Sequence, residues 1–254
     1  MSISEKSSTL PKENRVTNFY KLLPKKFQGG SLHYENEKEV NINIPNQMLF
    51  VGPTGSFKTN SMLYILTEMG CYTKIYVFCP NAEQSLYEWL ESKYKKVEKV
   101  TGEKHFFIFK SIDDIPNIDD TSLFNKENNT LFIFDDLMNE PEKKLQKIVD
   151  CYTRGRTKSI SVWMTSQNYY KLPITVRRNA GYIVFKKLNT TTELKKVAKE
   201  YEIDITDKQL ISLYKYAIST GPESFFLVDL KTMDPNLKFR VNLQGIRQKS
   251  VAAT

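Results

Sequence analysis

The eight residues from Gly52 to Thr59 limit what this chain can fold into more than any other part of the sequence. They read GPTGSFKT and lie between a short apolar run, residues 48–51, and a stretch with helical periodicity. Glycines let backbone N–H groups point into such a loop, and the helix that follows adds N–H donors and partial positive charge. A loop of this kind between a strand and a helix binds the phosphates of a nucleotide. The segment therefore predicts an α/β fold with a phosphate-binding loop.

Two residues of this loop are expected to carry specific chemistry. Lys58 is expected to reach the β- and γ-phosphate oxygens, and the Thr59 hydroxyl is expected to ligate Mg²⁺. The usual pattern has glycine immediately before the lysine, whereas this chain has Phe57. A phenylalanine there either restricts the backbone and crowds the phosphates or packs outward without harm, and the sequence leaves both open. The predicted nucleotide-binding residues are Gly52, Pro53, Thr54, Gly55, Ser56, Phe57, Lys58 and Thr59.

An apolar run, TLFIF at residues 130–134, ends in two carboxylates. In enzymes with a phosphate-binding loop, the first acid at such a strand end holds the Mg²⁺ hydration shell, and the next residue polarises the attacking water. Asp135 fits the first role and Asp136 the second, while Glu140 is a weaker candidate for the base. The paired motifs predict an ATPase that uses ATP and Mg²⁺.

Another apolar run, residues 160–165, is followed by Ser166, Gln167 and Asn168. An amide side chain at the tip of a strand beside the acidic one is well placed to sense the γ-phosphate or to orient water. Gln167 is therefore the predicted sensor residue.

Two basic clusters flank this run. The first, RGRTK at residues 154–158, contains Arg154 and Arg156, either of which could complete the active site of a neighbouring subunit. The second, RRN at residues 177–179, could act in the same way or meet a phosphate backbone. The residues leave these alternatives open.

From residue 48 onward, apolar runs alternate with amphipathic stretches, which predicts βα units and a mainly parallel sheet flanked by helices. A short strand is also expected over residues 40–44. We expect a flexible basic arm (1–30), one ATPase domain (31–232) and a basic tail (233–254) with little to build a core. The predicted strands are 48–51, 74–79, 105–109, 130–134, 160–165, 181–185 and 225–229, and the predicted helices are 58–69, 82–94, 142–152, 191–201 and 207–217.

Composition narrows the class of protein further. The net charge is +8 and the isoelectric point is near 9.1, so polyanions such as nucleic acid are attracted to the chain. The three cysteines and two histidines lack the spacing of a zinc site, which indicates reduced thiols in a cytosol-like compartment. The mean hydropathy is -0.45 and no apolar run is long enough to span a membrane. A secretory signal is not evident at the N-terminus.

Four segments together resemble the poxvirus-type genome-packaging ATPases of large eukaryotic DNA viruses and virophages, within the FtsK-HerA superfamily. They read MLFVGPTGSFKTN (48–60), FDDL (134–137), YTRGR (152–156) and SVWMTSQNYYKLPITVRRN (161–179), and the resemblance covers approximately residues 45–186. Phe57 departs from it, because family members generally keep glycine there.

The resemblance implies a RecA-like core with additional strands and a homo-oligomeric ring, with a hexamer favoured. Such a ring pumps double-stranded DNA into a preformed capsid, with capsid proteins as partners, at the assembly site in the host cytoplasm, and the virion is a further place where it could be found. It also implies Asp135 for magnesium, Asp136 as the catalytic acid residue, Gln167 as sensor, and Arg154 or Arg156 as a finger acting in trans.

Two other readings remain. The first is a different P-loop enzyme, such as a helicase or a nucleotide kinase, although an arginine-rich lid and a second acceptor pocket are not evident. The second is a structural component of the virion with a degenerate loop. Phe57 is its only support, and the Asp135–Asp136 pair and the intact Lys58–Thr59 argue against it.

Overall fold

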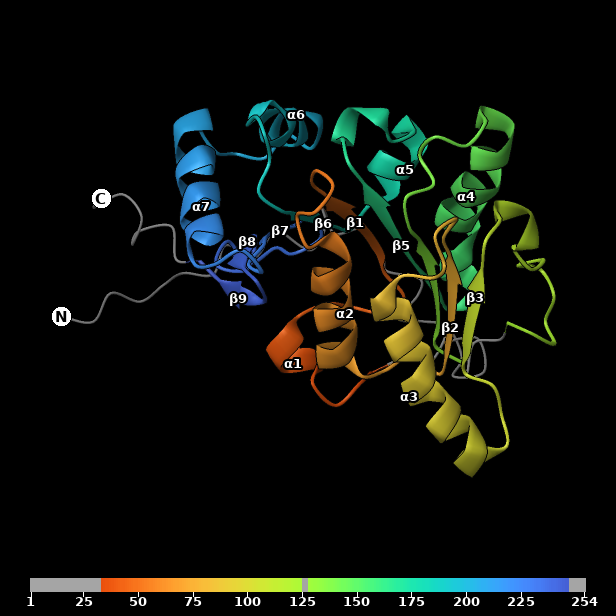
Figure 1. Ribbon diagram of the computed structural model, residues 1–254. Helices are drawn as coiled ribbons and strands as arrows, with labels where there is room; N and C mark the ends of the chain where they lie inside the picture. The colour runs from red at the N-terminus through yellow and green to blue at the C-terminus, as the bar shows by residue number, and fades with distance from the viewer. Residues whose placement is uncertain (1–32, 125–127, 247–254) are drawn as a thin grey trace, which may run out of the picture. The chain divides into compact units, whose positions relative to one another are not determined.

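The computed structural model describes residues 33–124 and 128–246, which form a mixed sheet with helices on both faces (Figure 1). Within the described residues the sheet has nine strands in the order β3-β2-β4-β5-β1-β6-β7-β8-β9. Strands β3 through β6 in this order run parallel, and β7, β8 and β9 are antiparallel to their neighbours. This confirms the predicted α/β class with a mainly parallel sheet. The strands are β1 (Gln47–Val51), β2 (Lys74–Phe78), β3 (Phe106–Phe109), β4 (Thr130–Phe134), β5 (Ile160–Ser166), β6 (Tyr182–Phe185), β7 (Phe226–Asp229), β8 (Phe239–Val241) and β9 (Gln244–Gly245).

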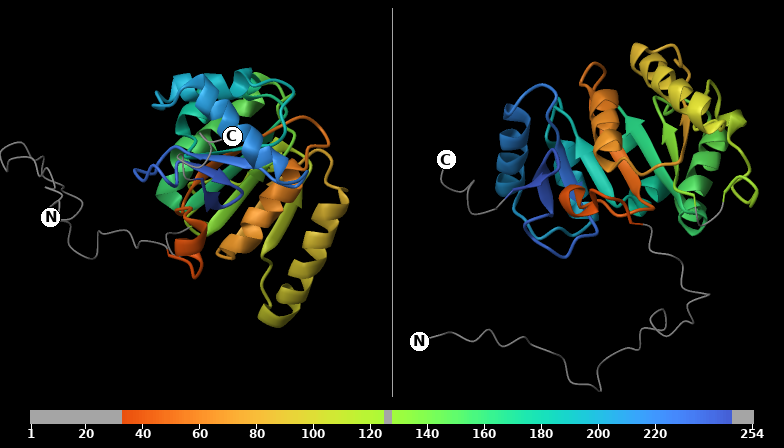
Figure 2. Two further views of the ribbon diagram at one scale, coloured as in Figure 1. Left: turned by 90° about the vertical axis from the view of Figure 1, so that its left-hand side faces the viewer. Right: turned by 90° about the horizontal axis from the view of Figure 1, so that it is seen from below.

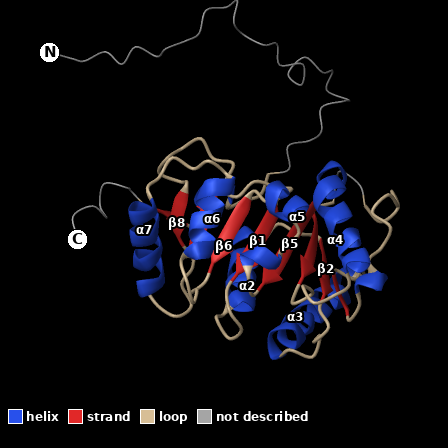
Figure 3. Cartoon of the chain, turned by 90° about the horizontal axis from the view of Figure 1, so that it is seen from above, coloured by secondary structure: helices blue, strands red, loops and turns tan. Residues whose placement is uncertain are grey.

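The central strands are apolar at successive positions because helices cover both faces of the sheet (Figures 2 and 3). Leu49 and Val51 of β1 pack in one cluster with α4, α5, α6 and α7, whereas Met48 and Phe50 pack in the other with α2 and α3. The helices are α1 (Glu37–Val40), α2 (Lys58–Met69), α3 (Ser85–Thr101), α4 (Glu142–Arg154), α5 (Ile174–Asn179), α6 (Thr192–Glu200) and α7 (Asp207–Ser219). Short 3₁₀ turns lie at Ile112–Asp114, Gly155–Lys158 and Tyr169–Lys171.

The predicted strand at residues 40–44 is wrong. Residues 37–40 form the single-turn helix α1, and Asn41 ends it in the left-handed conformation with φ 52°. The short helix α5 was not predicted, and α3 continues past the predicted end at residue 94 to Thr101, where Gly102 takes φ 74°. The other predicted elements agree with the structure to within about two residues, which is the usual scatter at element ends.

The described part of the predicted tail, residues 233–246, belongs to the sheet. β8 pairs antiparallel with β7, and both Phe239 and Arg240 are buried. This differs from the expectation that residues after 232 have little to build a core. The predicted arm, residues 1–30, and the tail beyond residue 246 lie outside the described residues.

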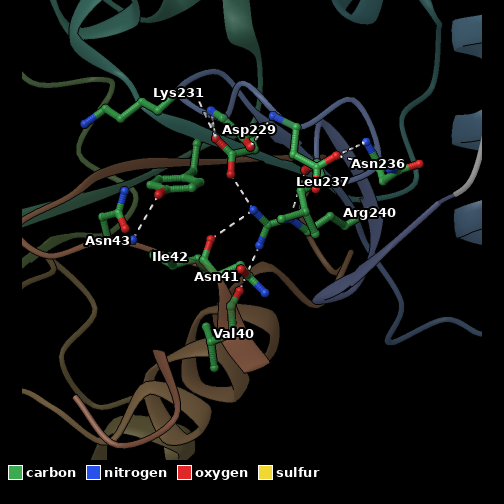
Figure 4. A network of polar contacts seen from close by, with 12 residues as sticks. Val40, Asn41, Ile42, Asn43, Asp229, Lys231, Asn236, Leu237 and Arg240 are labelled. Carbon is green, nitrogen blue, oxygen red and sulfur yellow. Dashed lines mark hydrogen bonds and ion pairs between the residues drawn. The ribbon is translucent and has the colours of Figure 1, made fainter. Parts of the chain in front are cut away.

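Arg240 joins three parts of the fold (Figure 4). Its guanidinium donates to the carbonyls of Val40 at 2.8 Å and Asn41 at 2.9 Å, and forms an ion pair with Asp229 at the end of β7. Its Nε donates to the Leu237 carbonyl at 3.0 Å. A buried arginine is tolerated here because each side of the guanidinium meets an acceptor.

Across the part of the chain that the structure describes, no helix has the length and apolar character needed to cross a membrane.

Candidate functional site

A pocket of about 450 Å³ opens where β1, β2, β4 and β5 end. Ligands of α/β proteins commonly bind at the carboxyl ends of such strands. The loop after β1 forms one wall, and the ends of β4 and β5 form the other. The pocket is lined by Thr54, Gly55, Ser56, Phe57, Lys58, Thr59, Asn60, Asn81, Gln84, Leu86, Asp135, Asp136, Thr165 and Gln167.

The predicted phosphate-binding loop is compact. A Cβ atom at Gly52 would lie 2.7 Å from both Lys186 Cβ and Ser56 Oγ, so the close approach requires glycine at this position. Gly55 takes φ 75°, a conformation that glycine adopts without a steric penalty. Lys58 Nζ donates to the carbonyls of Gly52 at 2.8 Å and Pro53 at 3.0 Å, so its ammonium lies within the loop. Burial lowers the pKa of Lys58, and the nearby aspartates oppose that effect.

Phe57 keeps the backbone conformation of a glycine. It is the residue before the first turn of α2, with φ 64° and ψ 31°, and its carbonyl accepts a hydrogen bond from Ser61 N–H at 3.0 Å. Its side chain is 48% exposed at the pocket rim. The sequence left open whether Phe57 restricts the backbone or packs outward. The structure shows part of each, because the ring is partly exposed to solvent while the backbone lies in a region unfavourable for phenylalanine.

Asp135 lies immediately after β4 and is buried. Its Oδ1 accepts a hydrogen bond from the Thr165 hydroxyl at 2.6 Å, and its Oδ2 accepts one from the Tyr87 hydroxyl at 2.7 Å. Burial, together with the Asp135 carboxylate, raises the pKa of Tyr87 well above its usual value, so the phenol stays protonated and donates. The carboxylate therefore has a fixed orientation at the pocket wall.

Asp136 and Gln167 meet at the mouth of the pocket. Gln167 Nε2 donates to Asp136 Oδ1 at 3.2 Å, and both side chains are exposed. The backbone of Asp136 has φ 55°, and its N–H donates to the Thr165 hydroxyl at 3.1 Å. Because the same hydroxyl binds Asp135, Thr165 connects the two acids. Glu140, the weaker candidate, does not line the pocket and lies near Lys144.

The oxygen atoms in the pocket fit a magnesium ion that arrives with a nucleotide. Thr59, Asp135 and Asp136 supply hydroxyl and carboxylate oxygens, the donors that Mg²⁺ prefers. Among the described residues there is no group of three or more His, Cys, Asp or Glu side chains that could hold a metal alone. A Mg²⁺ ion keeps several waters and usually binds through one or two carboxylates together with substrate phosphates.

The predicted arginines lie at the other end of the sheet. Arg154 ends α4, and Arg156 lies in the turn just before β5, at the amino end of this strand, whereas the pocket is at the carboxyl ends. Arg154 forms an ion pair with Asp119. Arg156 is exposed, and in the described ranges its side chain has no hydrogen bond or ion pair. Arg177 of the second cluster is instead buried and pairs with Glu200 at 2.6 Å, a structural contact.

Sequence reasoning missed six residues of this site. Asn60, Asn81, Gln84, Leu86 and Thr165 line the pocket, and Tyr87 binds Asp135 from behind it. Asn81, Gln84 and Leu86 follow β2, the sheet neighbour of β4, and a mainly parallel sheet places such strand ends at the same edge. The contact of Tyr87 with Asp135 has no sequence signal.

The profile of the family described as Poxvirus A32 protein matches residues 33–221. No sequence among curated proteins matches the chain.

Several solved structures share the fold. The genome packaging NTPase B204 from Sulfolobus turreted icosahedral virus 2 in complex with sulfate has a TM-score of 0.52 and 14% identity, covering 79% of this chain and 96% of that one. The DNA-packaging ATPase B204 from Sulfolobus turreted icosahedral virus has a TM-score of 0.51 and 14% identity, covering 81% and 100%. The virus 2 protein in complex with AMPPCP has a TM-score of 0.51 and 14% identity, covering 78% and 96%.

Proposed function

We propose that this chain, which belongs to the Poxvirus A32 protein family, is an ATP-hydrolysing motor that moves double-stranded DNA into a preformed viral capsid. At the level of the family it is a viral genome-packaging ATPase. One observation carries the proposal furthest. Lys58, Thr59, Asp135, Asp136 and Gln167, chosen from separate parts of the sequence, all line one pocket.

The pocket suits water attack on the γ-phosphate of ATP. Lys58 would neutralise charge on the transferring phosphoryl group, and the loop N–H groups would bind the remaining phosphate oxygens. Thr59 and Asp135 would hold Mg²⁺, which would supply further positive charge to the transferring phosphoryl group. Asp136 would orient and polarise the attacking water. Gln167, which contacts Asp136 at 3.2 Å, would report whether the γ-phosphate is present.

Support for ATP as the ligand also comes from B204, a protein of the same fold whose structure was solved in complex with AMPPCP. The proposed partners are double-stranded DNA, viral capsid proteins and further copies of the chain in a ring, with a hexamer favoured. The net charge of +8 favours a polyanionic partner. The proposed place of action is the virus assembly site in the host cytoplasm, and the basic arm at residues 1–30 is proposed to contact DNA or capsid.

ATP hydrolysis by the full chain, measured with and without duplex DNA, tests this function. We expect wild type to hydrolyse ATP faster with DNA, and Lys58→Ala to lower the rate by about 100-fold or more. Lys95→Ala is the matched control, because Lys95 is an exposed lysine of α3 that pairs with Glu91 away from the pocket. Absence of hydrolysis by wild type in every condition would contradict the proposal.

The same assay separates the alternatives. A nucleotide kinase would transfer phosphate to a small acceptor and would not respond to duplex DNA. A helicase would respond to DNA but would also separate its strands. A structural component with a degenerate loop, for which Phe57 is the only support, would hydrolyse nothing.

A further inference from the structure

The Asp135 carboxylate is held on both oxygens by hydroxyl groups from two different elements. Thr165 of β5 donates to Oδ1 at 2.6 Å, and Tyr87 of α3 donates to Oδ2 at 2.7 Å. The exposed fractions of Asp135, Thr165 and Tyr87 are 3%, 1% and 0%. Because an ionised carboxylate can accept about four hydrogen bonds, both oxygens retain a site for another ligand. The two donors therefore fix the plane of the carboxylate and leave part of it facing the pocket.

Tyr87 connects this carboxylate to the first turn of α3. The helix begins at Ser85, and its neighbours Gln84 and Leu86 line the nucleotide pocket. The ring of Tyr87 packs in the apolar cluster between α2, α3 and the sheet, so packing fixes the direction of its hydroxyl. Phenylalanine at this position would keep the packing and remove only the donor.

We propose that Tyr87 is a positioning residue of the ATPase site, whose hydroxyl orients Asp135 toward the hydration shell of nucleotide-bound Mg²⁺. The inference rests on the proposed role of Asp135. Tyr87 itself contacts neither the nucleotide nor the metal, and it acts through the carboxylate. Loss of such an outer partner commonly lowers metal affinity by about 10- to 100-fold. We expect the lower end, about tenfold, because phosphates and waters supply most ligands of a bound Mg²⁺.

The test compares Tyr87→Phe with Tyr152→Phe in the full chain. Tyr152 is a matched control, because its hydroxyl is also buried but donates to the Met48 carbonyl at 2.9 Å, away from the acids. Binding of ADP is measured by calorimetry in EDTA and across a Mg²⁺ titration. For Tyr87→Phe we expect the half-saturating Mg²⁺ concentration to rise about tenfold while ADP affinity in EDTA stays within about twofold. For Tyr152→Phe we expect neither value to change.

Three outcomes would overturn the inference. The first is a Mg²⁺ dependence for Tyr87→Phe within twofold of wild type, and the second is an equal loss of ADP affinity with and without Mg²⁺. The third is a Tyr87→Phe chain that does not fold while Tyr152→Phe does, because the hydroxyl would then be structural. Hydrolysis is assayed separately. If wild type binds Mg²⁺ and ADP but hydrolyses no ATP, the proposed function fails, yet the binding comparison still decides the role of Tyr87.

Discussion

Phe57 occupies a loop position where the backbone has φ 64°, so the residue type there sets a balance between strain and chain entropy. A left-handed conformation costs a residue with a Cβ roughly 1–2 kcal/mol. Glycine removes that cost but adds about 0.4–1 kcal/mol of unfolded-state entropy. The ring is 48% exposed, so its removal also loses part of its apolar burial, about 1 kcal/mol. We therefore expect the free energy of unfolding of Phe57→Gly in urea denaturation to stay within about 1 kcal/mol of wild type, and to exceed that of Phe57→Ala by about 0.5–1 kcal/mol. We expect ATP turnover to rise, because glycine leaves no ring at the rim of the pocket.

Phe57→Ala is the control for this prediction. Alanine removes the ring but keeps the Cβ, so the backbone strain remains. If the alanine and glycine variants were equally stable, the strain at this position would not be the cause of the effect.

Lys186 gives a second residue-scale prediction. Its ammonium donates to the Ser61 hydroxyl and to the carbonyls of Glu223 and Ser224, and burial lowers its pKa from 10.5 to about 8, opposed by the Glu223 carboxylate. Between these two values the unfolded chain binds more protons than the folded one, so this group makes stability rise with pH. We therefore expect the thermal midpoint of Lys186→Met to rise less than that of wild type when the pH is raised from 7.5 to 9.5.

The adjacent exposed lysine provides the comparison for Lys186. Lys187→Met removes a lysine from the same segment without removing a buried ammonium. Its thermal midpoint should follow the wild-type pH dependence. An unchanged pH dependence in Lys186→Met would contradict the assigned direction.

At the scale of elements, Arg240 connects β8 to the end of β7 through an ion pair, and to the backbone at the end of α1 through hydrogen bonds. Arg240→Met keeps an apolar stem but leaves the Asp229 carboxylate buried without its cation. Breaking a buried ion pair in this way costs about 3–5 kcal/mol, and we expect a loss of about 3 kcal/mol in urea denaturation, since Asp229 Oδ1 keeps the N–H donors of Lys231 and Thr232. The exposed Arg178→Met should cost less than about 0.5 kcal/mol. A loss below about 1 kcal/mol for Arg240→Met would contradict this account.

Local sequence signals predicted some of these elements and missed others. Helix α2 and the strands around it were predicted because the glycine-rich loop and uninterrupted apolar runs are local signals. A strand was wrongly predicted over residues 40–44 because the apolar residues Val40, Ile42 and Ile44 recur at every second position, as they do in a strand. In the structure, Asn41 takes a left-handed backbone conformation instead. Strand β8 was missed because its central arginine suggests exposure, and only partners far along the chain allow it to be buried.

The candidate site was predictable to a similar extent. Lys58, Thr59, Asp135, Asp136 and Gln167 each follow or end an apolar run, and the structure brings them to one pocket. Their individual roles stay predictions. The Tyr87 contact with Asp135 joins positions 48 residues apart, and it depends on the exact packing of α3 on the sheet, which no local pattern encodes.

At the scale of the whole molecule, the predicted arginines and the nucleotide pocket lie at opposite ends of the sheet. The nucleotide pocket lies at the carboxyl ends of β1 and β4, whereas Arg154 and Arg156 precede β5 at its amino end. An arginine at that end cannot complete the pocket of its own chain. If an arginine finger exists in either position, a neighbouring copy must supply it, which is the geometry of a closed ring. Arg156 is the better candidate, because Arg154 is already paired with Asp119.

Mixing two inactive variants tests this arrangement. We expect Lys58→Ala and Arg156→Ala to be inactive when each is assembled alone with nucleotide and DNA. In a 1:1 mixed ring, about one quarter of the interfaces would combine an intact Lys58 with an intact Arg156 from the neighbour, so ATP hydrolysis should partly return. Lys95→Ala mixed with Lys58→Ala serves as the control, because Lys95 pairs with Glu91 on α3 away from the pocket, so Lys95→Ala alone should remain active and mixing should only dilute it. Failure of the first mixture to recover activity at any ratio, with mixed rings demonstrated by mass, would exclude Arg156 as a residue that acts across the interface.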